Sequence, residues 1–319
     1  MMEEVYDGTY MITLPLPKNP LRSVNCYLIR GADRDLLVDT GMNRPECRAP
    51  LDEALKELGV FRPEVFVTHM HADHLGLAPH ISGGEEAVYL GDEDRKVISE
   101  STYWSGMLEY ALRCGFPRVD PHEAIRKHPG YRFGPLGEMR ISSLFGGERL
   151  DLGERQLEAV WTPGHSRGHM CLYEREERTL FSGDHILFDI TPNISLWSDE
   201  EDPLSRYLGS LKMVSGMKIE RTLPGHRSRM GDPTERIDEL TRHHHERAEE
   251  VLSILEGGPL DPFTTASRMK WDMTYDSFDD LPIMQKWFAL GEAIAHLKFL
   301  ETTGRAERLK GERVRYRNI

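Results

Sequence analysis

Metal-seeking side chains crowd the stretch "VTHMHADHLG" (67–76), in which three histidines and an aspartate fall within six consecutive positions. In an extended segment alternate side chains point the same way, so His69 and His71 can face one ion. Asp73 and His74 follow where the chain turns, and they can face a second ion beside the first. Imidazole and carboxylate groups bind zinc, iron and manganese. The stretch therefore predicts one half of a metal site.

The other half is expected at four more strand ends, each of which finishes in a group that can hold or support a metal. These groups are Asp39 in "VDTG", His165 in "TPGHSRGH", Asp184 in "SGDH" and His226 in "LPGH". The glycine before each histidine lets the backbone turn sharply, so that the side chain can face the sheet edge. A single histidine is most often structural or exposed, but this many ligand-type residues at successive strand ends predict one shared centre.

The elements that must position these groups are expected to be short strands, followed by helices. Runs of β-formers separated by Gly, Asn and Asp predict strands at 9–17, 24–30, 35–41, 64–69, 87–91, 139–147, 156–164, 169–174, 179–184 and 219–226. Helical spacing of apolar residues predicts helices at 45–60, 203–214 and 233–255, then two further helices and a terminal hairpin in 259–319. Residues 92–135 depart from this pattern and are expected to form an insertion.

The composition is ordinary for a soluble globular protein, with 39% hydrophobic and 29% charged residues among 319. A formal net charge of −13 argues against a general polyanion binder. No apolar run is long enough for a membrane span, and the amino-terminal residues lack a secretory-signal pattern. The four cysteines are scattered, which suits a reducing compartment. We therefore expect a cytoplasmic protein without membrane association.

Taken in order, "THMHADHLG", "TPGHSRGH", "SGD" and "PGH" resemble the metallo-β-lactamase superfamily over about residues 35–226. The resemblance implies an α/β fold, the αββα sandwich, with a metal site at one edge of its two sheets. It also implies ligands for two ions: His69, His71 and His165 for the first, Asp73, His74 and His226 for the second, and Asp184 for both. Asp39 matches an aspartate that supports the site without ligating the metal.

Within this superfamily the ligand pattern favours hydrolases of thioesters, lactones or phosphodiesters. True β-lactamases commonly carry cysteine at the position of Asp184, and di-iron oxygen reductases carry an acid at the position of His71 and a flavin domain. The expected cofactors are two divalent metal ions, zinc first, with iron or manganese as alternatives. A hydroxide bridging the ions would attack the substrate. The resemblance gives Asp73 the catalytic role of orienting that hydroxide and passing a proton to the leaving group. The leading substrate is a small-molecule thioester or related acyl compound.

The last part of the chain resembles the winged-helix module of the hydroxyacylglutathione-hydrolase-like branch. The stretches that carry this resemblance are "HHHERAEEVLSILEGGP", "ASRMKWD", "GEAIAHLKFLETTGRAERL" and "RAERLKGERVRYR". We therefore predict a catalytic domain at 1–232, with an insertion or lid at 92–135, and a helical winged-helix-like domain at 233–319. The second domain is expected to pack beside the active site and shape it, or to mediate a homodimer.

The winged-helix resemblance leaves two alternative functions open. One is a metal-dependent endoribonuclease or phosphodiesterase acting on single-stranded RNA, and the other is a nucleic-acid-binding protein with a vestigial metal site. The terminal hairpin is basic, but a solvated hairpin accounts for that charge as well as phosphate contact does. The helix before it has Glu292 and Glu301 against Lys298, and it lacks the arginine and asparagine side chains that read base edges.

Other side chains are assigned smaller roles. Tyr103, Trp104, Met107 and Tyr110 either cover the site as an apolar lid or, as their helical spacing favours, belong to a core. His169 and His185 neighbour ligand positions and are candidates for contacts with ligands or substrate. Surface or packing roles are expected for His80, His122 and His128. The three histidines at 243–245 cannot all face one ion from a helix.

Overall fold

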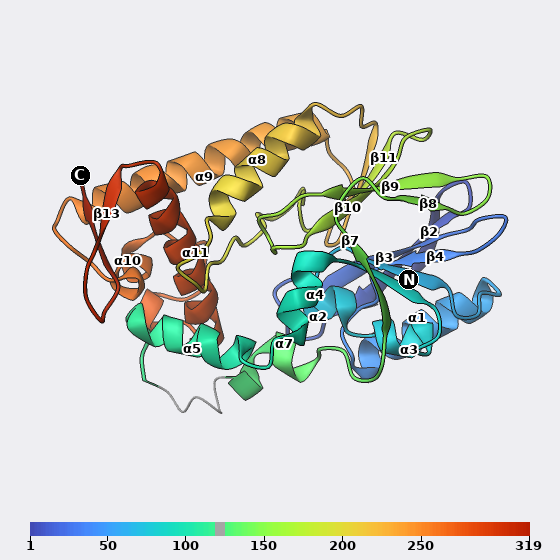
Figure 1. The fold of residues 1–319 in the computed structure, drawn as a ribbon, viewed down its shortest axis with the longest axis horizontal. Coiled ribbons are helices and arrows are strands. Elements are labelled where there is room, and N and C mark those ends of the chain that lie inside the picture. Colours follow the sequence, from blue (N-terminus) through green and yellow to red (C-terminus); the bar gives the residue numbers. More distant parts are fainter. Residues whose placement is uncertain (119–124) are drawn as a thin grey trace.

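The structure is a computed structural model that describes residues 1–118 and 125–319. His122 lies outside the described residues. Strands and helices are mixed along the chain up to β12, and Figure 1 shows a mainly helical segment at the carboxyl end. The strands are β1 Met2–Tyr6, β2 Thr9–Pro15, β3 Ser23–Ile29, β4 Leu36–Val38, β5 Glu64–Val67, β6 Ala87–Gly91, β7 Arg140–Leu144, β8 Arg149–Asp151, β9 Gln156–Trp161, β10 Met170–Glu174, β11 Thr179–Gly183, β12 Arg221–Pro224, β13 Ala306–Leu309 and β14 Arg315–Asn318. The α-helices are α1 Pro45–Glu57, α2 Ala72–Leu75, α3 Ala78–Ser82, α4 Asp92–Ser99, α5 Tyr103–Arg113, α7 Pro129–Arg132, α8 Pro203–Ser215, α9 Pro233–Leu255, α10 Pro262–Arg268 and α11 Ile283–Thr302.

The larger sheet has the strand order β1-β2-β3-β4-β5-β6-β7. Strands β1 to β4 pair antiparallel, whereas β4, β5, β6 and β7 pair parallel with their neighbours. A parallel pair needs a crossover connection, and α1 supplies it between β4 and β5. The carboxyl ends of β4 and β5 therefore lie at the same edge of the sheet.

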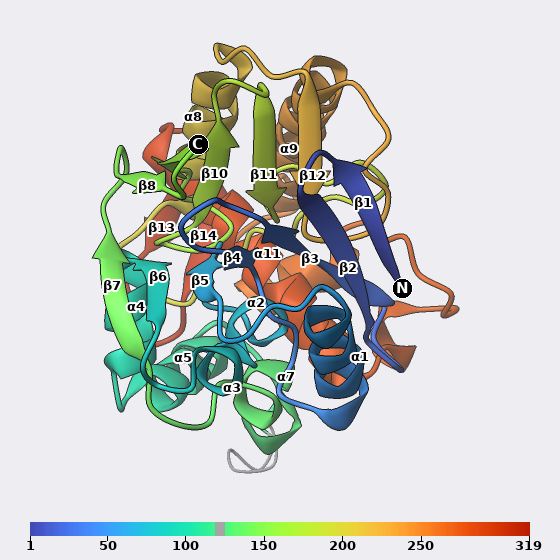
Figure 2. The ribbon, with the colours of Figure 1, turned by 90° about the vertical axis from the view of Figure 1, so that its right-hand side faces the viewer.

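The smaller sheet has the order β12-β11-β10-β9-β8, and β11 and β12 form its parallel pair. Figure 2 shows the two sheets face to face, with α1 and α3 outside the larger sheet and α8 and α9 outside the smaller. A hydrophobic core between the sheets contains Tyr27, Phe66, Leu172 and Phe181, all essentially buried. This layering is the αββα sandwich, so the predicted fold class is confirmed.

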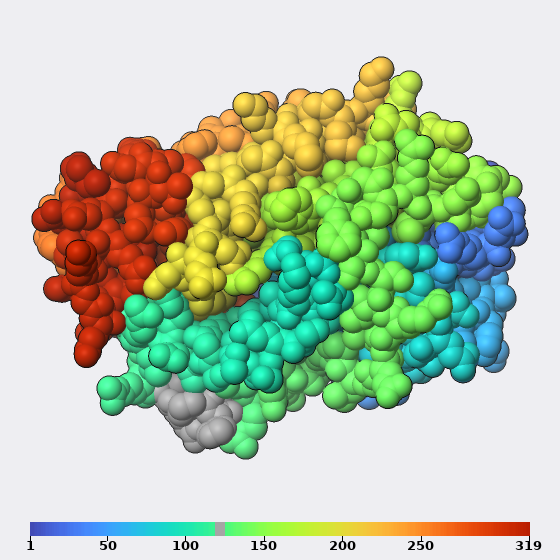
Figure 3. Space-filling view, viewed as in Figure 1, coloured from blue at the N-terminus to red at the C-terminus, as the bar shows by residue number. Residues whose placement is uncertain are grey.

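The insertion and the C-terminal segment share one hydrophobic core with α8 and the outer face of the smaller sheet. Phe116, which follows α5, contacts Phe263 of α10 and Trp287 of α11 edge to face. Figure 3 shows the C-terminal segment in red at one end of the molecule, against the teal surface of α5. The core runs across residue 232, so the domain division stays a prediction. Of the four aromatic and methionine side chains proposed as a lid, Met107 and Tyr110 belong to this core.

Two strands were not expected from the sequence. β1 lies at the edge of its sheet and carries the exposed Glu3 and Glu4, so it lacks the apolar alternation of a half-buried strand. β8 contains three residues. Every helix in residues 1–118 and 125–319 is too short or too polar to cross a bilayer.

Candidate metal centre

The histidine cluster begins where β5 ends. Three of the four residues of β5 are fully buried, and His69 follows two positions after the strand with no exposed surface. His71 is the N-cap of the short helix α2 and has extended backbone, whereas Asp73 and His74 lie within the helix. The start of α2 therefore turns Asp73 and His74 away from the direction of the strand, as the sequence predicted.

Glycines place the two later histidines in different ways. Gly164 adopts a φ of +146°, and a Cβ there would lie 2.4 Å from the Cβ of Tyr207, so the turn into His165 requires glycine. Gly225, before His226, does not adopt a positive φ. A Cβ there would lie 2.7 Å from a carboxylate oxygen of Asp184. The predicted sharp turn is therefore confirmed at Gly164, while Gly225 provides space for the site.

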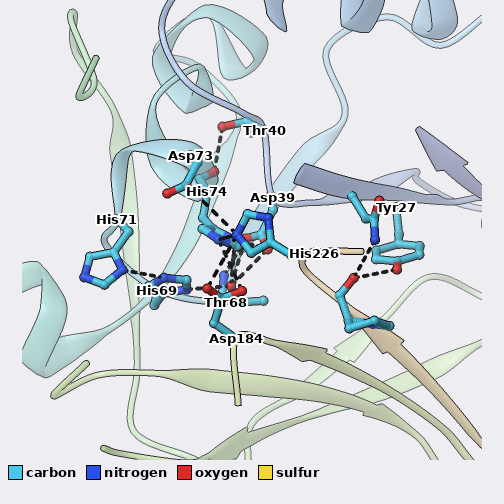
Figure 4. Close-up of polar contacts among 12 residues, drawn as sticks. Tyr27, Asp39, Thr40, Thr68, His69, His71, Asp73, His74, Asp184 and His226 are labelled. Atoms are coloured by element: carbon cyan, nitrogen blue, oxygen red, sulfur yellow. Dashed lines mark hydrogen bonds and ion pairs between the residues drawn. The ribbon is translucent and has the colours of Figure 1, made fainter. Parts of the chain in front are cut away.

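All seven predicted ligands meet at one place, although they come from segments up to about 150 residues apart. Figure 4 shows His69, His74, Asp184 and His226 approaching one another from separate elements. Three groups have ligand atoms within 4.8 Å of one another: His69, His71 and His165; His69, His74 and Asp184; and Asp73, His74 and His226. Among the described residues, every cluster of this kind lies in this centre.

The first group consists of three imidazoles that face one another. His71 Nδ1 lies 2.9 Å from His69 Nε2 and 3.0 Å from His165 Nε2. His69 is fully buried, whereas His71 is exposed and lies on the solvent side. Three imidazoles directed at one point are a donor set that zinc takes in catalytic sites, where the fourth position is open. The group therefore fits a divalent ion that solvent can reach.

The third group combines two imidazoles with a carboxylate. His74 Nε2 lies 3.3 Å from His226 Nε2, and His226 Nε2 lies 3.5 Å from Asp73 Oδ2. Nitrogen and carboxylate oxygen donors together suit zinc, iron or manganese. A second divalent ion therefore fits beside the first.

Asp184 lies between these two groups. Its Oδ2 is 3.6 Å from His165 Nε2 and 3.5 Å from His226 Nε2, and its Oδ1 is 3.6 Å from His74 Nε2. The side chain is 8% exposed, and Oδ1 has no hydrogen-bond partner among the described residues. A buried carboxylate oxygen that accepts no hydrogen bond is costly in the protein alone. Asp184 is therefore suited to be a ligand that two cations share.

Asp39 supports the centre from behind. Its Oδ2 lies 2.7 Å from His74 Nδ1, and the carboxylate also accepts hydrogen bonds from the backbone N–H and the hydroxyl of Thr68. The φ of Asp39 is +61°, a conformation uncommon for any residue except glycine. The contact leaves His74 Nε2 directed at the other ligands, which is the supporting role that the resemblance implied. Figure 4 shows Asp39 and Thr68 beside His74.

Backbone carbonyls hold two further imidazoles. His165 Nδ1 donates to the carbonyl of Asn193 at 2.9 Å, and His226 Nδ1 donates to the carbonyl of Ser23 at 2.6 Å. A carbonyl only accepts, so each ring carries a proton on Nδ1, and in its neutral form has its free electron pair on Nε2. Both rings therefore have the tautomer that binds a cation through Nε2.

The pKa shifts differ between the histidines of the centre. Burial lowers the pKa of His69 and of His165 well below the usual value, so both rings are neutral and able to ligate. Burial also opposes the charged form of His74, but Asp39 and Asp184 outweigh it and raise its pKa to about 10. Burial likewise opposes ionisation of Asp73, yet neighbouring His74 and His226 lower the pKa of this carboxyl. The carboxylates thus attract a proton in the protein alone and would attract a metal cation in its place.

Asp94 is a structural residue of the site that sequence reasoning missed. It is fully buried and accepts hydrogen bonds from the backbone N–H groups of Met70 and Gly168 and from the hydroxyl of Ser166, at 2.7–2.9 Å. It therefore ties the loop that carries His69 and His71 to the loop that carries His165. In the sequence it sits among Asp92, Glu93 and Arg95, where nothing distinguishes it from solvated charge.

The remaining histidines have other roles. His169 is fully buried, and its Nε2 accepts a hydrogen bond from the backbone N–H of Asp184 at 3.2 Å, so it contacts the backbone of a predicted ligand. His185 is buried against the ring of Tyr207. His80 pairs with Asp52 near the surface, and His128 caps α7, so the predicted surface and packing roles are confirmed for both.

Two family models match the chain. The model of the metallo-beta-lactamase superfamily matches residues 19–226, and that of the metallo-beta-lactamase-like C-terminal domain matches residues 277–319. An acyl-coenzyme A thioesterase of Gallus gallus is 27% identical over 70% of this chain and 79% of its own length. The lactamase-like protein nscB of Neosartorya fischeri is 26% identical, and the match covers 74% of this chain and 57% of that protein. The atrochrysone carboxyl ACP thioesterase of Aspergillus fumigatus is 26% identical over 84% of this chain, which spans 53% of that protein.

Solved structures match over nearly the whole chain. A metallo-beta-lactamase family protein from Thermus thermophilus has a TM-score of 0.83 and 29% identity, and the match covers 99% of this chain and all of that one. A beta-lactamase domain protein from Burkholderia ambifaria has a TM-score of 0.85 and 28% identity, over 100% of this chain and 94% of that one. Two of the relatives are named as thioesterases. The family model spans most of the chain, including every predicted ligand, and we conclude that the chain belongs to the metallo-β-lactamase superfamily.

Proposed function

We propose that this chain is a dinuclear metal-dependent hydrolase whose substrate is a thioester or a related small acyl compound. The observation that carries the proposal is Asp184, a buried carboxylate between two groups of ligand-type side chains, with one oxygen that accepts no hydrogen bond among the described residues. The names of two relatives, an acyl-coenzyme A thioesterase and an ACP thioesterase, support a thioester as the substrate class.

The proposed ligand sets follow the two groups and their shared aspartate. One divalent ion would be held by His69, His71 and His165, a second by Asp73, His74 and His226, and both by Asp184. Zinc, iron and manganese all suit these donors. When bound, such ions acidify a water molecule and polarise a carbonyl oxygen.

Asp73 is the proposed proton-transfer group. Its side chain is 11% exposed at the edge of the centre, and the lowered pKa of its carboxyl keeps it ionised near neutral pH. It can therefore accept a hydrogen bond from the attacking water and receive its proton. The water oxygen bonds to the thioester carbonyl carbon, the carbon–sulfur bond breaks, and the proton passes to the leaving sulfur. The products are a carboxylic acid and a thiol.

An aromatic group beside His71 is proposed to receive the acyl part. His128 caps α7, and α7 packs against α2. Burial, together with the neighbouring His71, lowers the pKa of His128 to about 4. The ring of His128 lies 4.8 Å from that of Trp104 and 5.8 Å from that of Phe288. Tyr131, which is 54% exposed, lies edge to face with Trp104 at 6.0 Å. Exposed aromatic surface next to a polar centre suits a ligand with an apolar chain.

The proposal is tested by hydrolysis assays on zinc-loaded protein with acyl-coenzyme A thioesters, a lactone, a phosphodiester and single-stranded RNA. We expect thioester hydrolysis that is lost in Asp184→Asn, because the amide removes the charge between the two groups. His80→Ala, which changes an exposed histidine paired with Asp52, is the control and should retain activity. The proposed substrate class would be contradicted if the protein cleaved only RNA or the phosphodiester and if Asp184→Asn abolished that cleavage.

A further inference from the structure

We infer that helix α11 of the C-terminal segment positions the ligand His165, and that Glu292 is the positioning residue. The inference rests on the proposed metal site and gives the C-terminal segment a role in it. It concerns the path from Glu292 through Asn193 to the imidazole of His165.

The first step of this path is the hydrogen bond that orients His165. His165 Nδ1 donates to the backbone carbonyl of Asn193 at 2.9 Å, which directs Nε2 toward His71 Nδ1 and Asp184 Oδ2. Rotation of the imidazole would break this bond, so the direction of Nε2 depends on where the Asn193 carbonyl is held. The element after β11 that carries Asn193 has no regular secondary structure, so something else must hold it.

The second step is the attachment of the Asn193 loop to α11. Asn193 Nδ2 donates to Glu292 Oε2 at 3.2 Å, and the backbone N–H of Leu196 donates to the carbonyl of Gly291 at 3.1 Å. A Cβ at Gly291 would lie 2.6 Å from Ser195 Oγ, so the loop approaches this helix closely enough to require glycine. These contacts fix the loop to one turn of α11.

The third step is the anchoring of Glu292. Its side chain is 15% exposed, and its other oxygen, Oε1, accepts from Arg247 Nη2 of α9 at 3.3 Å. Arg247 also donates to the carbonyl of Lys270 at 2.7 Å, and its guanidinium lies over the ring of Trp271. The Glu292 carboxylate is thus held on one side and offers its second oxygen to Asn193. If Glu292 served only as the ion-pair partner of Arg247, its contact with Asn193 would not be needed.

Partners that orient a ligating histidine typically change metal affinity by about 10–100-fold when they are lost. The test titrates metal-free full-length protein with Co²⁺ against a competing chelator and follows the absorption of the bound ion. Asn193→Ala leaves the Glu292–Arg247 pair intact and should weaken binding of one Co²⁺ by about tenfold, with an altered absorption band. Glu292→Ala should weaken the binding of one Co²⁺ and alter the absorption band in the same way.

Two further variants separate positioning from ordinary stability. Glu292→Gln keeps an oxygen for Asn193 but loses the ion pair, so it should lower the melting temperature of the metal-free protein and retain near wild-type Co²⁺ affinity. Glu301→Ala removes a carboxylate of the same helix that pairs with Lys298, and it should bind as the wild type does. Unchanged Co²⁺ affinity and absorption in Asn193→Ala would overturn the inference and leave the proposed function standing. Equal losses of affinity in Glu292→Gln and Glu292→Ala would also overturn it. Failure of the wild type to bind Co²⁺ would overturn the proposed function and the inference together.

Discussion

Asp73 has the largest exposed fraction among the carboxylates of the centre, 11% of its side chain against 8% for Asp184 and 2% for Asp39. Asp39 is 1% exposed and uses its oxygens on His74 and Thr68, so it has none left for a substrate. Asp184 lies between the two ligand groups. We therefore assign proton transfer in the proposed reaction to Asp73, the most exposed of the three carboxylates.

Asp73→Asn should lower kcat for thioester hydrolysis by about 10²–10⁴-fold, because the amide cannot accept the proton of the water. Asp73 belongs to only one of the two ligand groups, whereas Asp184 lies between them, so the variant should retain more metal than Asp184→Asn does. Steady-state kinetics and elemental analysis on the same preparations check both statements. Asp52→Asn, at an exposed carboxylate paired with His80, is the matched control.

Asp94 gives a prediction for the pH dependence of stability. Burial raises the pKa of this carboxyl from 3.8 to about 6, against the hydrogen bonds from Ser166, Gly168 and Met70. Between pH 4 and 6 the unfolded chain is then ionised at this position while the folded chain retains the proton. The free energy of unfolding should therefore fall as pH rises through that window, and the loss is complete above it.

The measurement compares chemical denaturation of metal-free wild type and Asp94→Asn from pH 4 to 7. The wild type should lose on the order of 3 kcal/mol relative to the variant as pH rises, since each pKa unit corresponds to about 1.4 kcal/mol. Parallel pH profiles for the two proteins would show that Asp94 does not titrate in this range.

Strand ends and turns decide where the ligands meet. β4 and β5 are parallel neighbours, so Asp39 and His69 follow strands that end at the same edge. β11 and β12 form the parallel pair of the other sheet, and they deliver Asp184 and His226. Carboxyl ends of parallel strands in both sheets thus converge, which explains why the ligands follow strands along the sequence.

Gly225→Ala tests how closely these two sheets approach. The added methyl would lie 2.7 Å from Asp184 Oδ1 and 2.8 Å from His74 Cε1, so it should force the ligands apart. We expect a loss of about 1–3 kcal/mol of stability from overpacking, together with reduced metal content. Gly209→Ala in α8, where a Cβ meets nothing within 4 Å, should instead stabilise the protein by about 0.5–1 kcal/mol.

The aromatic group formed by α5, α7 and α11 gives a prediction about acyl-chain length. Trp104→Ala and Phe288→Ala should raise KM by up to about tenfold for long acyl thioesters, because an aromatic contact contributes about 0.5–1.5 kcal/mol. An acetyl thioester should be hydrolysed as before. Phe61→Ala, at a side chain 84% exposed before the amino end of β5, should leave both substrates unaffected. Equal effects on short and long chains would argue against an acyl-binding role.

The sequence predicted most elements because local signals mark them. Helix α9 has the expected bounds, 233–255, because Asp232 caps its first turn and glycines follow its end. β1 escaped prediction because an exposed edge strand with two glutamates has no buried face to impose alternation. The convergence of the seven ligands was predictable from repeated strand-end positions. The sequence did not predict the roles of Asp94, Asn193 and Glu292, because these roles come from contacts between residues 24 to 99 positions apart.

The charge of the whole molecule does not favour binding to nucleic acid. Its net charge is −13, and four arginines of the terminal hairpin pair with carboxylates of this chain: Arg305 with Glu249, Arg308 with Asp199, Arg313 with Asp261 and Arg317 with Glu307. Half of the residues of α11 are buried, so this helix packs into the core that the C-terminal segment shares with α8 and α9. These features favour a supporting role for the C-terminal segment.

Whether one chain holds two cations is measured most directly by the metal content of the purified protein after loading with zinc and removal of free metal. Elemental analysis against an accurate protein concentration should give two ions per chain, and Asp184→Asn should give fewer. One ion or less per chain in the wild type under these conditions would contradict a centre that holds two ions.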